Sequence, residues 1–114
     1  MTSHPFSRRF RLEQWHYIKL KILSESPLPT SINDVVFRMS IHQAMMDTLG
    51  VVGAGIKLEV IDWDEKEHTG IIKAPQSELI SVWGALVTHE FSLASQPCVF
   101  DILSSSSQLL SLAV

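Results

Sequence analysis

The sequence predicts an α+β domain in which two helices cover one face of a four-stranded antiparallel sheet. Three observations support this: an alternating apolar pattern near the start, two stretches with apolar residues at helical spacing, and an acidic turn between two strand-like runs. With 114 residues, the chain has the length of one domain. We expect a basic N-terminal arm at residues 1–13 and a single domain at residues 14–114.

The first strand is expected from Gln14 to Glu25, ended by Pro27 and Pro29. Its residues alternate between an apolar face and a second face, which is the period of a half-buried strand. The apolar face carries Ile18, Leu20 and Ile22, and the other carries Tyr17, Lys19 and Lys21.

A first helix is expected to begin after a cap at Thr30 or Ser31 and to run to about Leu49. Three glycines then stop it: Gly50, Gly53 and Gly55.

A hairpin is expected next, with strands at Ile56–Trp63 and Thr69–Ala74. The polar turn Asp64–His68 joins them. A second helix follows from Ser77 to about His89, and its core face is expected to carry Leu79, Val82, Trp83 and Leu86.

The last strand is expected at Cys98–Leu103, before a polar run at Ser104–Ser107 and an apolar tail at Leu109–Val114. The resulting order is β-α-β-β-α-β, the split βαβ arrangement of ferredoxin-like domains. That arrangement leaves one face of the sheet open. We expect this open face to carry Tyr17, Lys19, Lys21, Glu59, Ile61, Trp63, Lys73 and Asp101.

The net charge of −3 argues against a free-standing nucleic-acid binder, which normally needs a basic face. The third strand also lacks the aromatic residues with which RNA-recognition domains of this topology stack bases. Basic residues nevertheless gather in the first 25 positions. Direct RNA binding therefore stays an alternative, with candidate contacts at Arg8, Arg9, Arg11, Tyr17, Lys19 and Lys21.

The sequence contains one cysteine, Cys98, and neither a signal peptide nor a run long enough to span a membrane is expected. We expect a soluble, intracellular chain. The five histidines lack metal-ligand spacing, and the glycine cluster runs from a helix into a strand, opposite to a phosphate loop. We therefore predict no catalytic residue, no metal and no cofactor.

One enzyme alternative stays open. Val35-Val36-Phe37-Arg38 resembles the end of the acylphosphatase phosphate loop, but the preceding Gly and Gln of that loop are absent. Asn33 is the only asparagine, whereas that family uses one on the following strand. The alternative is a free-standing ferredoxin-like enzyme or small-molecule binder.

The first helix carries two apolar stripes. Val35, Val36, Met39, Met46 and Leu49 form the stripe that we expect to pack on the sheet. The stripe on nearly the opposite side is our candidate partner interface, because a second apolar face in a small domain usually marks a binding surface. It consists of Phe37, Ile41 and Met45. In the alternative, the tail Leu109–Val114 folds back over it.

Both ends of the chain resemble a known family. Trp15-His16-Tyr17-Ile18-Lys19-Leu20 is similar to the opening strand of the small protein subunits of ribonuclease P and ribonuclease MRP. Pro97–Leu103, with the serine run and Leu109-Leu110-Ser111-Leu112, looks like the last strand and tail of the smallest fungal subunit. The helix-to-strand connection Gly50–Gly55 departs from the family's pattern, because it lacks the aromatic residue often found there.

The resemblance implies a non-catalytic subunit of an RNA-based endoribonuclease that removes 5′ leaders from precursor tRNA or processes precursor ribosomal RNA. It implies as partners a subunit of the same fold, a TIM-barrel-like subunit and, directly or indirectly, the catalytic RNA. It also implies a place in the nucleus and nucleolus.

Overall fold

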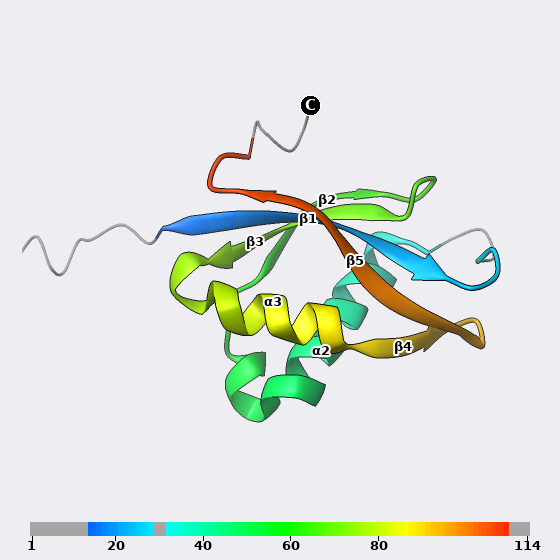
Figure 1. Cartoon of the computed structure of the whole chain (residues 1–114), viewed down its shortest axis with the longest axis horizontal. Helices are drawn as coiled ribbons and strands as arrows, with labels where there is room; N and C mark the ends of the chain where they lie inside the picture. Colours follow the sequence, from blue (N-terminus) through cyan, green and yellow to red (C-terminus); the bar gives the residue numbers. More distant parts are fainter. Residues whose placement is uncertain (1–13, 29–31, 110–114) are drawn as a thin grey trace, which may run out of the picture.

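The computed structural model describes residues 14–28 and 32–109 and shows a twisted sheet with its helices on one side (Figure 1). The basic arm, the predicted caps Thr30 and Ser31 and the tail residues 110–114 lie outside the described residues. The elements, in chain order, are β1 (Trp15–Ser24), α2 (Asp34–Ala54), β2 (Glu59–Asp64), β3 (Thr69–Pro75), the 3₁₀ turn η1 (Gln76–Glu78), α3 (Leu79–Thr88), β4 (Glu90–Leu93) and β5 (Gln96–Ser106).

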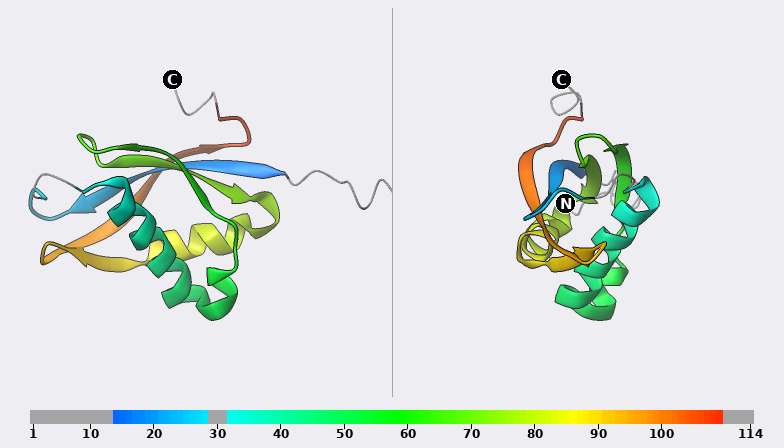
Figure 2. Two further views of the ribbon diagram at one scale, coloured as in Figure 1. Left: turned by 180° about the vertical axis from the view of Figure 1, so that it is seen from behind. Right: turned by 90° about the vertical axis from the view of Figure 1, so that its right-hand side faces the viewer.

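The described sheet has five strands, in the order β2-β3-β1-β5-β4, and every neighbouring pair is antiparallel. The predicted number of four is therefore wrong, while the general ferredoxin-like α+β arrangement is confirmed. The additional strand, β4, forms a hairpin with β5, and Ala94 and Ser95 turn the chain with positive φ angles. Both helices lie on the same face of the sheet (Figure 2).

Strand β1 lies at the centre of the sheet, between β3 and β5. Ile18, Leu20 and Ile22 are buried on its helix side, as predicted. Both neighbouring strands place apolar residues beside this side of β1. Ile18 lies opposite Ile72 on β3, and Leu20 lies opposite Ile102 on β5. A register slip would turn all three apolar side chains toward the other face.

Strand β5 is longer than predicted and includes most of the serine run. Ser104, Ser105 and Ser106 pair with Lys19, Ile18 and Tyr17 of β1. Serine is a weak strand former, so the local sequence indicated a turn. The long partner strand β1 supplies the backbone hydrogen bonds that override this local preference.

Strand β2 contains an irregularity that corrects one predicted position. Its register with β3 shifts between Val60 and Asp62, so one residue, Ile61, has no partner of its own. The shift returns Trp63 to the helix side, where its ring stacks on Phe37 with centroids 4.4 Å apart. Trp63 therefore does not lie on the open face of the sheet.

The turn between β2 and β3 is stabilised by Asp64, the last residue of β2. The Asp64 carboxylate accepts hydrogen bonds from the backbone N–H groups of Lys66 at 2.9 Å and Glu67 at 3.2 Å. His68 ends the turn at a φ of 55°. Aspartate commonly stabilises a turn in this way, and the predicted hairpin is confirmed.

Helix α2 begins two or three residues later than predicted. The cap is Asn33, whose side-chain oxygen accepts a hydrogen bond from the N–H of Val36 at 3.0 Å. At Gly50 the backbone leaves helical geometry, with φ 68° and ψ −150°, and one further turn, residues 51–54, follows. The predicted end of the long helix is therefore confirmed, but a short segment continues in a new direction.

Helix α3 follows the turn η1 and packs beside α2 under the sheet (Figures 1 and 2). Val82, Ala85 and Leu86 are its fully buried residues. Trp83 was expected in the core but is 36% exposed. None of the helices formed by the described residues has both the length and the apolarity that a bilayer crossing requires.

Candidate protein-interaction surfaces

The predicted partner interface on α2 is corrected by the structure. Phe37, Ile41 and Met45 are at most 3% exposed and belong to the core between α2 and the sheet. Ser40 and Ala44, which lie on the same side of the helix, are also buried. These five residues form one continuous buried side of α2, so the stripe that contains Phe37 faces the core.

Three of the five residues of the other α2 stripe are exposed, whereas Val36 and Leu49 are half-buried against the core. Val35 is 53% exposed, Met39 65% and Met46 36%. The helix therefore has two apolar sides, as the spacing predicted, but the side expected to pack on the sheet is the more exposed one. Spacing alone identifies both sides and does not decide which one meets the sheet.

Helix α3 carries a second exposed apolar stripe. Ile80 is 89% exposed and Val87 49%, and Trp83 lies between them on the same side. The sequence of α3, LISVWGALVT, contains no charged residue. Gly84 belongs to the same side, and a methyl group added there would meet no other atom within 4 Å. A partner backbone therefore has room to approach the helix at this position.

The turn after Gly50 adds two more exposed side chains, Val51 at 84% and Val52 at 79%. Val52 lines the same cavity as Ser77 and Glu78, which lead into α3. Of the twelve exposed large apolar residues in the described part of the chain, eight lie on α2 and α3. We call them the helical face: Val35, Met39, Met46, Val51, Val52, Ile80, Trp83 and Val87.

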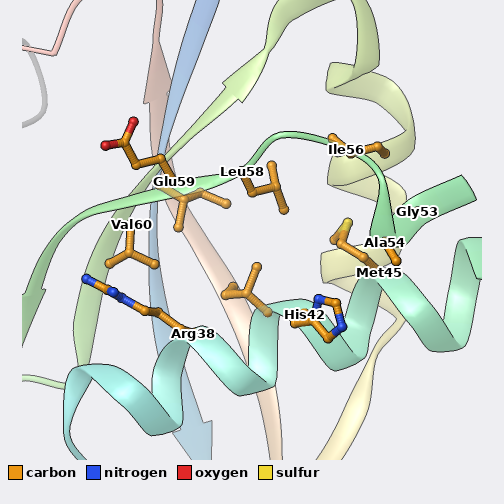
Figure 3. A pocket seen from close by; sticks show the side chains of 11 residues that line it. Arg38, His42, Met45, Gly53, Ala54, Ile56, Leu58, Glu59 and Val60 are labelled. Carbon is orange, nitrogen blue, oxygen red and sulfur yellow. The ribbon is translucent and has the colours of Figure 1, made fainter. Parts of the chain in front are cut away.

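A groove separates α2 from the edge strand β2. It consists of two adjoining cavities of about 450 and 420 Å³ that share Arg38 and Val60 as lining residues. In the first cavity, Arg38 and His42 of α2 lie across from Glu59 and Val60 of β2 (Figure 3). We call the two cavities together the seam groove.

The open face of the sheet brings together the described part of the candidate RNA contacts. Tyr17, Lys19 and Lys21 are half-buried on the face opposite the helices, as predicted. The ammonium of Lys73 lies 4.3 Å from the centre of the Trp15 ring and 3.8 Å from a Glu59 carboxylate oxygen. The remaining candidates, Arg8, Arg9 and Arg11, fall outside the described residues.

The polar side chains named for the acylphosphatase alternative have structural partners. Arg38 lies within helix α2 and pairs with Asp34 one turn earlier, at 3.5 Å, while Asn33 caps the helix. Among the described residues, no group of three or more His, Cys, Asp or Glu is placed to hold a metal ion. Arg38 and Asn33 both have contacts at the start of helix α2.

Two surface features were not predicted from the sequence: the exposed apolar stripe of α3 and the seam groove. The α3 stripe had a visible signal, because an uncharged helix of ten residues has more apolar positions than one buried side needs. The seam groove had none, since it arises from the distance between α2 and β2.

Comparison with known proteins agrees with the resemblance at the N-terminal end of the chain. The family model described as "Ribonucleases P/MRP protein subunit Pop8" matches residues 14–89, which include the Trp15–Leu20 motif but not the predicted C-terminal motif. Ribonuclease P protein subunit p14 of Mus musculus is 28% identical over 100 residues, covering 88% of this chain and 80% of the relative. The Homo sapiens protein of the same name is 27% identical, covering 88% and 79%.

A solved structure shares the fold. A chain in the cryo-EM structure of yeast ribonuclease MRP superposes with a TM-score of 0.76 at 21% identity, over 86% of this chain and 77% of that one. The family model, in turn, spans well over half of the sequence. The chain therefore belongs to the Pop8 family of ribonuclease P/MRP protein subunits.

Proposed function

We propose that this ribonuclease P/MRP subunit has no catalytic site of its own and acts by binding another protein subunit through its helical face. The observation that carries the proposal is the concentration of exposed apolar side chains on α2 and α3. Large apolar patches on small domains usually mark protein interfaces. In this role the chain supports 5′-leader removal from precursor tRNA and the processing of precursor ribosomal RNA by the assembled particle.

The partners that fit this role are those implied by the family resemblance. They are a protein subunit of the same fold, a TIM-barrel-like subunit and the catalytic RNA of the particle. We further propose that the chain works where such particles process their substrates, in the nucleus and nucleolus.

The direct test is affinity purification of the full chain from its own cells, with protein and RNA recovered together. We expect another ribonuclease P/MRP protein, the particle RNA and cleavage of precursor tRNA or ribosomal RNA in the purified fraction. A monodisperse chain recovered without either RNA or another subunit would refute the proposal.

Direct RNA contact is a second candidate, favoured by Trp15 and Tyr17 on the same sheet face as Lys19, Lys21 and Lys73. Aromatic rings and lysines together suit a single strand, by base stacking and phosphate neutralisation.

This candidate is tested with the isolated full chain and a single-stranded RNA. Replacing Lys19 and Lys21 by Gln should weaken RNA binding and lower the slope of log affinity against log salt by about 1.4, since each phosphate contact on a single strand contributes about 0.7. An unchanged slope would rule out these two contacts.

A further inference from the structure

Strand β2 offers an unpaired edge. It is the last strand on its side of the sheet and, within residues 14–28 and 32–109, pairs with β3 alone. The outward backbone groups of such a strand form a template on which an extended peptide adds as a further strand. The irregularity at Ile61 interrupts this template, so it accepts a short segment and resists continuous pairing with long strands.

The seam groove runs beside this edge and has an apolar floor. In its first cavity, of about 450 Å³, Ile41, Met45 and Ile72 are buried, while Leu58 and Val60 are half-buried. In Figure 3, Leu58 and Val60 lie on one side of the cavity, and Arg38 and His42 of α2 lie on the other. A strand laid along β2 directs alternate side chains to the helix side of the sheet. The cavity therefore suits an aliphatic side chain from such a strand.

The negative charge along the β2 edge indicates which polar residues a bound segment would carry. Residues 59–67 hold five carboxylates, at Glu59, Asp62, Asp64, Glu65 and Glu67, against one lysine. Asp62 and Glu65 line the second cavity together with Asp34, whose carboxylate is already paired with Arg38. The edge is complementary to lysine or arginine.

We propose that the β2 edge and the seam groove bind an extended, basic segment of a partner protein. The segment pairs with β2, inserts an aliphatic side chain between α2 and β2, and places a lysine or arginine beside Asp62 and Glu65. The other described edge strand, β4, has only four residues, Glu90–Leu93. The inference rests on the proposed function only in taking the occupant to be a protein.

The test is a nuclear magnetic resonance titration of the ¹⁵N-labelled full chain with a synthetic, capped nonapeptide of alternating valine and lysine. We expect saturable shifts in the amides of β2 and of the α2 residues lining the groove, with slower hydrogen exchange in β2. Peptides with glutamate for lysine, or serine for valine, should not bind. The paired change Asp62→Lys and Glu65→Lys should weaken binding roughly tenfold, because two exposed attractions become repulsions.

The matched control is Glu90→Lys, which reverses a charge on the other edge strand and should leave the affinity unchanged. Shifts that fall on β4 or the helical face, or equal affinity for the lysine and glutamate peptides, would overturn the proposal. The titration contains no ribonucleoprotein, so its outcome is independent of the affinity purification. A chain that binds the peptide at β2 but purifies without RNA or another subunit refutes the proposed function alone.

Discussion

Phe37 and Trp63 form a contact that ties helix α2 to strand β2. Their rings stack at 4.4 Å, and the indole N–H of Trp63 donates a hydrogen bond to the carbonyl of Ile32 at 2.7 Å. Gly70 on β3 makes space for the stack, because a methyl group there would lie 2.5 Å from the Phe37 ring. The glycine is thus required for close packing, although its own φ is not positive.

Gly70→Ala should therefore destabilise the fold. Forcing a methyl group into a packed core typically costs about 1–3 kcal/mol. Urea unfolding followed by tryptophan fluorescence measures the change. Gly84→Ala is the matched control, since a methyl group there meets no atom within 4 Å and the position is helical. An equal loss of stability in both variants would contradict the assigned role of Gly70.

The burial of Cys98 makes the stability of the folded protein depend on pH. The thiol is 2% exposed, and desolvation raises its pKa above the ordinary value of 9.0, although a backbone hydrogen bond partly opposes the shift. The unfolded chain ionises first as the pH rises, so the stability associated with the neutral thiol is present below pH 9.0 and lost above it.

We expect the urea midpoint of the wild-type chain to fall more between pH 8 and pH 10 than that of Cys98→Ala. The comparison with Cys98→Ala separates the contribution of this thiol from every other effect of pH on the urea midpoint. Equal falls in the two proteins would show that the thiol does not ionise differently on unfolding.

Single residues could be placed from sequence where alternation or turn chemistry determined them. The inward set Ile18, Leu20 and Ile22 and the turn after Asp64 are examples. Trp63 could not be placed, because one unpaired residue, Ile61, reverses the alternation that follows it. A bulge depends on backbone pairing with a neighbouring strand and has no clear mark in the local sequence.

At the scale of elements, helix α2 depends on Gly50. The φ of 68° there is unfavourable for residues with a Cβ atom, and it lets the chain turn before the exposed pair Val51 and Val52.

Gly50→Ala should destabilise the protein by about 1 kcal/mol or more, through backbone strain alone, because no atom lies within 4 Å of the added methyl group. In the helical position of Gly84, alanine should instead be neutral or stabilise by up to about 1 kcal/mol. Thermal unfolding of the two variants checks the opposite signs. A stabilised Gly50→Ala variant would show that the chain does not turn at Gly50.

Most helices and strands could be predicted from the sequence, and the two segments that could not, β4 and the serine part of β5, share a physical cause. The two helices and the central hairpin have strong periodic or turn signals in the sequence. Strand β4 and the serine part of β5 do not, since four residues are too short for a pattern and serine favours turns. Both form because a neighbouring strand offers backbone partners, which local reasoning does not see.

At the scale of the molecule, the structure separates three kinds of surface. The helices present apolar side chains, whereas the β2 edge is acidic and the open sheet face carries lysines with Trp15 and Tyr17. The sequence predicted that α2 has a second apolar side but assigned the exposed position to Phe37, Ile41 and Met45, which lie in the core. Packing against the rest of the protein decides which side is buried, and the sequence pattern of one helix does not show it. The corrected surface extends over α3 as well.

We propose above that the helical face binds another ribonuclease P/MRP protein subunit. Affinity purification of the tagged full chain tests this binding by comparing Ile80→Glu with Leu103→Glu. Ile80 is 89% exposed on α3 and Leu103 46% exposed on β5, so neither change should prevent folding. We predict that Ile80→Glu lowers recovery of the partner subunit at least roughly tenfold, as for a central interface residue, while Leu103→Glu retains it. Equal recovery with both variants would contradict the claim.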